Sequence, residues 1–379
     1  MTQTQDTRES LEYQTTSDLE PGRKLRFGRD TGFQSELRRR VDAYFQRTQL
    51  SQRDCAQMYL KTAIILVAFA TTYGLLVFVA QTWWQALPLA VLLGLETAAI
   101  GFNIQHDGGH EGYSNHGWVN QAMSLTLDLI GGSSYVWHWK HGVFHHMYTN
   151  ISHYDADVEV GIMGRVSPHQ PRLPIHRWQH IYLWALYGLM PIKWHLYDDF
   201  HDVISGRIGA QTFPRPQGWD LVRFLLGKAI FLTLAFALPL LRHPLGVVLV
   251  FYGVMAIALG IVLSTVFQMA HCVEEAEFPQ PLPNTSCMED AWAIHQIATT
   301  VNFSRNNPVI TWLLGGLNYQ VEHHLFPRIC HIHYPEMAKI VESTCQEFGI
   351  TYREHPSFVG GVVSHARWLR RLGASSVMG

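Results

Sequence analysis

Four long apolar segments dominate the pattern of hydrophobic and polar residues along the chain. The last of them runs for 26 residues without Lys, Arg, Asp or Glu, whereas a helix needs only about 20 apolar residues to cross a bilayer. The pattern therefore predicts membrane-spanning helices rather than buried helices of a soluble protein. The predicted spans are Thr62–Ala80, Ala86 to about Gln105, about Phe224 to Leu241, and Leu245–Ala270.

The connections between these segments predict how the helices pair. The short sequence QTWWQ (Gln81–Gln85) joins the first two, and residues 242–244 join the last two. Trp83 and Trp84 fit the aromatic belt of a membrane interface. We therefore expect an all-α, multi-pass membrane fold in which four transmembrane helices form two hairpins.

A fifth apolar segment, Ile181–Ile192, is only 12 residues long. It is too short to cross a bilayer and is flanked by Trp178 and Trp194. We expect this segment to lie at the membrane interface.

The distribution of Lys and Arg predicts how the hairpins are oriented. Residues 1–61 hold 11 of them, residues 106–223 hold eight and residues 271–379 hold seven, whereas the two hairpin turns hold only Arg242. Loops rich in Lys and Arg stay in the cytoplasm, so both termini and the long middle region are expected there. These regions would form a helical cap on the cytoplasmic ends of the spans.

Composition and termini narrow the class of protein. The first 50 residues are polar and lack the apolar segment of a signal peptide, so we expect residues 1–50 to form a flexible or surface-lying arm and residues 51–379 the membrane domain. The net charge of -2 argues against nucleic-acid binding, which needs a basic excess. The five cysteines form no CxxC pair, which argues against a zinc ribbon.

Histidine is the unusual residue of this chain, with 22 copies against 28 of Lys and Arg together. Three short motifs, HDGGH, HGVFHH and QVEHH, concentrate them, and one more histidine ends the fourth span. A spacing of four residues places two imidazoles on one face of a helix. The candidate residues are His106, His110, His141, His145, His146, His271, Gln320, His323 and His324.

All of these motifs lie on the predicted cytoplasmic side, at or near the ends of predicted spans, which points to one shared metal site. Nitrogen donors of this kind bind transition metals, and eight histidines exceed the roughly four ligands of a single zinc ion. Two metal ions fit the count better. Gln320 could ligate or hydrogen-bond a metal-bound water, and the carboxylates that could orient the rings are Asp107, Asp155, Asp157 and Glu322.

Other metal and nucleophile chemistries lack their motifs. The chain has no HExxH, no Glu-x-x-His pair, no Walker-type phosphate loop and no GxSxG elbow. Metalloproteases, carboxylate-bridged di-iron bundles, P-loop enzymes and α/β-hydrolases are therefore disfavoured.

The three motifs resemble the histidine boxes of integral-membrane fatty acid desaturases. Gln320 at the start of the third box is typical of the front-end group, and the flanking strings GFNIQHDGGHEGYSN and LNYQVEHHLFPRICHIHYPEM are similar to cyanobacterial acyl-lipid Δ6 desaturases in particular. The resemblance covers roughly residues 95–370.

This resemblance implies a di-iron enzyme that uses O2 and two electrons to desaturate a fatty acyl lipid or acyl thioester. The eight histidines would be the iron ligands. Because the chain has no HPGG heme motif and no room for a cytochrome b5 domain in its first 50 residues, an external electron donor is implied. Ferredoxin is the expected donor, and cytochrome b5 is the alternative.

Two alternative functions remain at this stage. The same scaffold can catalyse acyl hydroxylation or acetylenation, which only product analysis would distinguish. A histidine-rich metal transporter is a different class, but it needs polar residues along its spans. Apart from Lys228 in the weaker third segment, the spans carry only Glu96, which we expect to hydrogen-bond a neighbouring helix.

Overall fold

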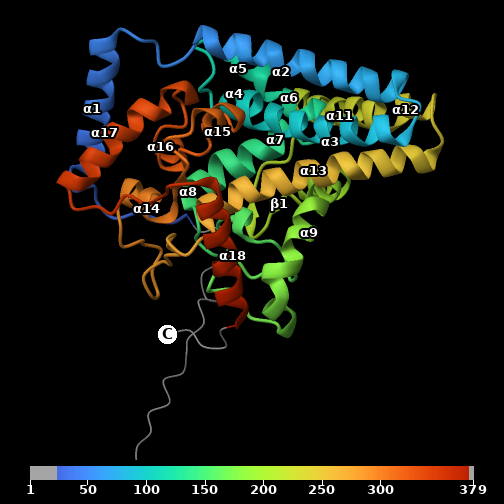
Figure 1. Cartoon of the computed structure of the whole chain (residues 1–379). Helices are drawn as coiled ribbons and strands as arrows, with labels where there is room; N and C mark the ends of the chain where they lie inside the picture. The colour runs from blue at the N-terminus through green and yellow to red at the C-terminus, as the bar shows by residue number, and fades with distance from the viewer. Residues whose placement is uncertain (1–23, 375–379) are drawn as a thin grey trace, which may run out of the picture.

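The computed structural model describes residues 24–374, and this part of the chain is mostly helical, with very few strand residues. Four of its helices are long and apolar enough to cross a membrane, with mean hydropathies between 1.7 and 2.6. They run side by side as the elongated half of the molecule in Figure 1. Their bounds are Ala56–Val79, Trp83–Gly109, Trp219–Leu240 and Leu245–His271.

These helices confirm the prediction of an all-α membrane fold. The first and third begin about five residues earlier than predicted, at Ala56 and Trp219, because polar and charged residues continue the helix beyond its apolar part. Their component elements are α2 (Ala56–Gly74) with η2 (Leu75–Val79), α3 (Trp83–Ile100) with η3 (Gly101–Gln105) and α4 (His106–Gly109), α11 (Trp219–Leu232) with η8 (Thr233–Ala237) and α12 (Leu238–Leu240), and α13 (Leu245–His271).

The remaining elements form the compact half of the molecule and the connections to it. Before and between the hairpins lie α1 (Phe33–Thr48), α5 (Gly117–Ser124), α6 (Thr126–Leu129), α7 (Ser134–Trp137), η4 (His138–His145), α8 (His146–Tyr148), η5 (Ala156–Val158), η6 (Pro174–Trp178), α9 (Gln179–Lys193), η7 (Trp194–Asp198) and α10 (Asp199–Ser205). After the fourth span come α14 (Trp292–Thr299), α15 (Pro308–Leu313), α16 (Gln320–Leu325), η9 (His331–His333), α17 (Tyr334–Glu347) and α18 (Phe358–Ala374).

Two short strand pairs complete the described residues. β1 (Arg207–Ile208) and β2 (Gln211–Thr212) are antiparallel, with Arg207 opposite Thr212. β3 (Asn302–Phe303) and β4 (Glu354–His355) are parallel, with Asn302 opposite Glu354. The parallel pair ties the segment after α14 to the segment before α18.

Glycines allow the fourth span to pack closely on its neighbours. A Cβ at Gly94 of α3 would lie 2.4 Å from the Met255 carbonyl oxygen of α13. A Cβ at Gly260 of α13 would lie 2.3 Å from the Tyr187 carbonyl oxygen of α9. Because such small residues let helix backbones approach each other, α13 packs between α3 and α9. The helix α9 contains Ile181–Ile192, the segment that we expect at the membrane interface.

Glu96 and Lys228, the charged residues within the predicted apolar segments, both have partners. Glu96 accepts a hydrogen bond from Thr72 of α2 at 3.0 Å, which confirms the expected contact with a neighbouring helix. Lys228 of α11 is buried and lies 2.6 Å from Asp199, and it also donates to the Gly131 carbonyl at 2.7 Å. Charges in such surroundings are tolerated only when they are paired.

Part of the predicted N-terminal arm is folded onto the cap. Phe33, Leu37, Val41 and Phe45 recur every fourth residue of α1 and are all buried. They share one apolar cluster with α17, which lies against α1 in Figure 1. The stripe is narrow and surrounded by charged residues, so the segment reads as polar on average. The domain boundary at residue 50 stays a prediction.

Candidate metal centre

The eight histidines of the sequence motifs come from four places in the fold and meet at one end of the membrane helices. All are buried, with at most 7% of each residue exposed. In Figure 1, α4, α8 and α16 gather around the end of α13 where the long helices meet the cap. His106 and His110 come from α4 and its C-terminus, His141, His145 and His146 from η4 and α8, His271 from the end of α13, and His323 and His324 from α16.

The second motif is shaped by a π-helical segment, η4. Here the backbone N–H of His146 bonds the carbonyl of His141, five residues back. The wider turn brings both following histidines against His141, whose ring centroid lies 4.9 Å from those of His145 and His146. An α-helical spacing of four aligns only one pair, so the π turn explains how the third imidazole joins the site. Single π turns are frequent at functional sites.

One group of ligand atoms belongs to His106, His110, His141 and His323, and these atoms all lie within 4.8 Å of one another. The Nε2 atoms of His106 and His141 are 3.3 Å apart. His146 adjoins this group, with its Nε2 3.3 Å from that of His141 and 3.0 Å from that of His323. Nitrogen ligands at about 2.1 Å from one metal ion lie at similar distances from each other.

A second group is formed by His145, His271 and His324, again within 4.8 Å. The Nε2 atom of each is buried and has no hydrogen-bond partner among the described residues, and the same holds for His110. A buried polar atom without a partner costs free energy. These unpaired nitrogens fit a site that binds a cation, and imidazole nitrogens suit iron, zinc, copper or nickel.

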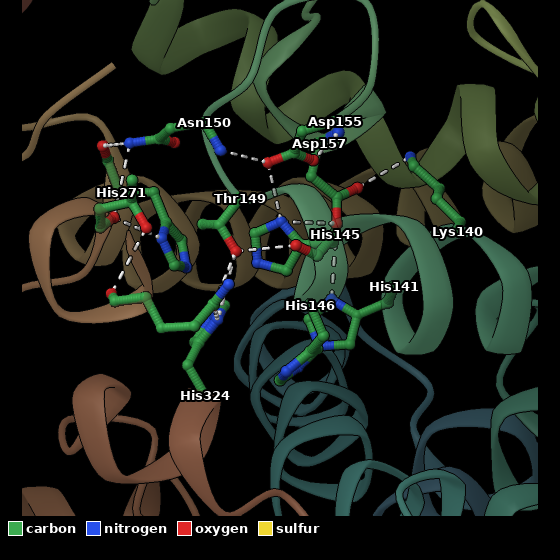
Figure 2. Close-up of polar contacts among 12 residues, drawn as sticks. Lys140, His141, His145, His146, Thr149, Asn150, Asp155, Asp157, His271 and His324 are labelled. Carbon is green, nitrogen blue, oxygen red and sulfur yellow. Dashed lines mark hydrogen bonds and ion pairs between the residues drawn. The ribbon is translucent and has the colours of Figure 1, made fainter. Parts of the chain in front are cut away.

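The opposite ring nitrogens of this second group are all held in place (Figure 2). An Nδ1–H bond of this kind fixes the tautomer and turns the Nε2 lone pair toward a metal. The partners are Asp155 Oδ2 for His145 at 3.0 Å, the Thr299 carbonyl for His271 at 3.2 Å and Gln296 Oε1 for His324 at 2.9 Å.

The first group is anchored less completely. His141 Nδ1 lies 3.4 Å from Asp157 Oδ2, and His323 Nδ1 lies 3.3 Å from the Tyr334 hydroxyl. Asp157 in turn lies 3.3 Å from Lys140. The two aspartates thus carry negative charge beside the rings without replacing an imidazole at the centre.

Burial sets the protonation of most of these rings. It lowers the pKa of His110, His146, His323 and His324, and the neighbouring imidazoles lower it further. These rings are therefore neutral, as metal ligands must be. His145 differs: burial alone would lower its pKa, but the Asp155 carboxylate outweighs this effect and raises it.

Three other residues from the sequence analysis have different partners. Gln320 donates from its amide nitrogen to the Leu317 carbonyl at 2.9 Å. Asp107 Oδ2 lies 3.0 Å from His331 Nδ1, away from the eight rings. Glu322 accepts hydrogen bonds from Asn302 and Tyr352, both at 2.8 Å, and so ties the cap together. Of the four carboxylates proposed to orient the rings, only Asp155 and Asp157 contact them.

Several supporting residues could not be recognised in the sequence. Gln296, the Thr299 carbonyl and Tyr334 lie outside the histidine motifs and approach the rings only through the tertiary fold. Thr149 and Asn150 lie three and four residues after the second motif, but their residue types alone carry no metal-site signal.

Comparison with known proteins agrees with the resemblance of the motifs. A family model for fatty acid desaturases matches residues 81–356. The chain is 40% identical to the sn-1 linoleoyl-lipid 6-desaturase of Arthrospira platensis, over 92% of this chain and 95% of the relative. It is 39% identical to the enzyme of the same name from Synechocystis sp., over 93% and 99%. An acyl-lipid (8-3)-desaturase of Physcomitrium patens is 35% identical, over 89% and 71%.

The chain thus combines a buried polyhistidine site, four apolar helices and a match to a family of lipid-modifying enzymes. The family contradicts the alternative of a metal transporter, and it implies an acyl lipid substrate, O2 and a membrane context. The chain belongs to the fatty acid desaturase family and is a membrane fatty acid desaturase of the front-end type.

Proposed function

We propose that this protein introduces a cis double bond at the sixth carbon of an acyl chain carried by a membrane glycerolipid, using O2 and two electrons. The observation that carries the proposal is the convergence of eight buried imidazoles at the ends of apolar helices, where an acyl chain can arrive from the bilayer. The position and the lipid carrier are supported by two relatives that are named sn-1 linoleoyl-lipid 6-desaturases.

The proposed cofactor is a pair of iron ions. Two iron ions bound here would supply the redox chemistry that an unactivated C–H bond requires, which zinc cannot supply because it has one stable oxidation state. The amide nitrogen of Gln320 donates to the Leu317 carbonyl, which leaves its Oε1 atom as the group that could ligate or hydrogen-bond a metal-bound water. One ion would be held by His106, His110, His141 and His323, the other by His145, His271 and His324, with His146 next to both groups.

The residues of the chain have three tasks in this proposal. The neutral imidazoles bind the ions, and burial excludes bulk water from them. The Nδ1 partners keep the rings in one orientation, so that little reorganisation is needed during the reaction. The carboxylates of Asp155 and Asp157 offset the charge of the ions from behind the rings.

The proposed orientation puts the metal centre and both termini on the cytoplasmic face. It is supported by the Lys and Arg residues concentrated on the side of the cap, against the single Arg242 in the opposite turns. Residues 51–379 are proposed as the desaturase domain. An external donor, ferredoxin or alternatively cytochrome b5, would deliver the electrons to this face.

The test is lipid analysis of cells that make linoleoyl lipids and express the protein together with ferredoxin and its reductase. We expect a new trienoic acyl chain whose additional double bond, located by mass spectrometry, begins at the sixth carbon. Cells expressing His146→Ala are the matched control. A hydroxylated or acetylenic product would favour the alternative outcome of the same scaffold, and a double bond elsewhere would contradict the assigned position.

A further inference from the structure

We propose that Thr149 and Asn150 are positioning residues that hold the ligand group His145, His271 and His324 together. This inference rests on the proposed metal centre and concerns one of its two ligand groups. The two residues follow the second histidine motif after Met147 and Tyr148, and Figure 2 shows Thr149 between His271 and His145, with Asn150 above His271.

The side chain of Asn150 links the second motif to the end of the fourth span. Its amide nitrogen donates to the carbonyl of His271 at 2.9 Å and to that of Glu277 at 3.0 Å, and it lies 3.4 Å from the carbonyl of Thr299. The Thr299 carbonyl is also the acceptor for the His271 Nδ1–H. Asn150 therefore contacts both the backbone of this ligand and the group that orients its ring.

The backbone of Asn150 reaches a second ligand of the same group. Its N–H donates to Asp155 Oδ2 at 2.9 Å, and the same oxygen lies 3.0 Å from Nδ1 of His145. Asp155 is fully buried, so this carboxylate has little water to compete for its hydrogen bonds. One residue thus connects the orienting groups of two imidazoles that come from different elements.

Thr149 reaches the third ligand. Its hydroxyl donates to the His145 carbonyl at 2.7 Å and lies 3.1 Å from Gln296 Oε1 and 3.4 Å from His324 Nδ1. Gln296 Oε1 is the acceptor for the His324 ring. The dipeptide therefore contacts the supports of all three imidazoles.

The other ligand group does not share this support. No hydrogen bond of Thr149 or Asn150 in the described chain involves His106, His110, His141 or His323. Loss of the dipeptide's polar groups should therefore weaken the binding of one metal ion and leave the other. A residue that only stabilised the fold would affect both.

The backbone conformation of Asn150 allows its side chain to be removed without straining the turn. Its φ of 61° lies in the left-handed region, which glycine adopts without strain. Asn150→Gly therefore removes the side-chain amide and keeps the turn. Asn284 has a φ of 59° in an exposed loop, so Asn284→Gly is the matched control for the backbone change.

The role of Thr149, the other positioning residue, is tested by a pair of variants. Thr149→Val removes the hydroxyl at nearly constant shape, and Thr149→Ser restores it. If Asn150→Gly is recovered in too small an amount, these variants test whether the dipeptide supports the ligand group His145, His271 and His324.

The experiment measures iron per chain in the detergent-purified full chain after reconstitution with Fe2+, and then iron retention against increasing chelator. We expect wild type, Asn284→Gly and Thr149→Ser to bind two ions, and Asn150→Gly and Thr149→Val to bind one ion as before and the other about 10–100-fold more weakly. Helical circular dichroism should be unchanged in all of them. Equal weakening of both ions, or none, would overturn the inference. A wild-type chain that binds no iron would instead refute the proposed cofactor.

Discussion

Asp155 and His145 form a fully buried carboxylate–imidazole pair, with 3.0 Å between Oδ2 and Nδ1. Only 0% and 1% of their side chains are exposed, so water does not weaken this interaction. The carboxylate fixes the ring with its Nε2 atom toward His271 and His324. The same Asp155 oxygen accepts a hydrogen bond from the backbone N–H of Asn150, so the pair links this backbone to His145, a ligand of the proposed metal centre.

Replacing Asp155 by Asn should weaken this ligand while keeping its shape. The neutral amide no longer raises the pKa of His145 and makes the imidazole a poorer donor to a cation. We expect iron affinity to fall about 10–100-fold, measured by chelator competition. Asp220→Asn changes a half-exposed carboxylate beside Arg223 and should have no effect. Unchanged affinity in the Asp155 variant would show that the pair is not needed for binding.

His146→Ala should abolish desaturation and leave membrane insertion intact. His146 lies next to both ligand groups, with its Nε2 atom 3.0 Å from that of His323, and it belongs to α8, outside the four spans. The measurement is product formation in cells together with the amount of protein in the membrane fraction. His201→Ala, at an exposed site beside Asp202, is the control that should stay active. Retained turnover would remove His146 from the ligand set.

Lys228→Met should destabilise the protein by leaving the Asp199 carboxylate buried without its partner. Removal of one member of a buried ion pair costs about 3–5 kcal/mol. The double variant Lys228→Met with Asp199→Asn should recover most of this loss. Thermal unfolding in detergent measures both, and a single variant as stable as wild type would contradict the expectation.

The stability of the Lys228→Met variant should depend on pH. Burial raises the pKa of Asp199 to about 6 even with Lys228 present. Without Lys228 the pKa rises further, so the folded state binds a proton that the unfolded state releases. Stability of the variant relative to wild type should therefore increase as the pH falls from about 8 to about 6. The thermal midpoint of both proteins across this range is the measurement.

Leu37→Ala tests whether α1 belongs to the folded cap. Leu37 is 1% exposed within the apolar cluster that joins α1 to α17. Loss of such a side chain costs about 2–5 kcal/mol, which should lower the thermal midpoint. Arg38→Ala, on the exposed face of the same helix, should be nearly neutral. Equal behaviour of the two variants would mean that α1 does not support the cap.

The membrane helices and the histidines could be predicted because each leaves a strong local pattern. An uncharged run such as Leu245–Ala270 has few structural outcomes, and clustered imidazoles have few chemical ones. The helix α1 is harder to predict from the sequence, because four apolar residues among many charged ones barely change the local hydropathy. The structure shows the apolar stripe against α17, which no local pattern identifies as its partner.

The supports of the rings depend on tertiary structure and were predicted only in part. Asp107 and Asp155 are both close in sequence to histidine motifs, and the sequence offers no reason to separate them. In the fold, Asp155 returns to His145 through the turn at Asn150, whereas Asp107 faces His331. Gln296 reaches His324 from a separate helix, so its role follows only from how α14 and α16 pack.

The wide separation of the eight histidines along the chain sets an order of assembly. The first is residue 106 and the last is residue 324, so 217 residues must be synthesised between them. All four apolar helices precede the third motif, and the hairpins are therefore made before the site can be complete. A chain released before residue 323 would carry every predicted span but only six of the eight imidazoles. Loading of the centre is thus a late event in biogenesis, and it reports that translation has passed the third motif.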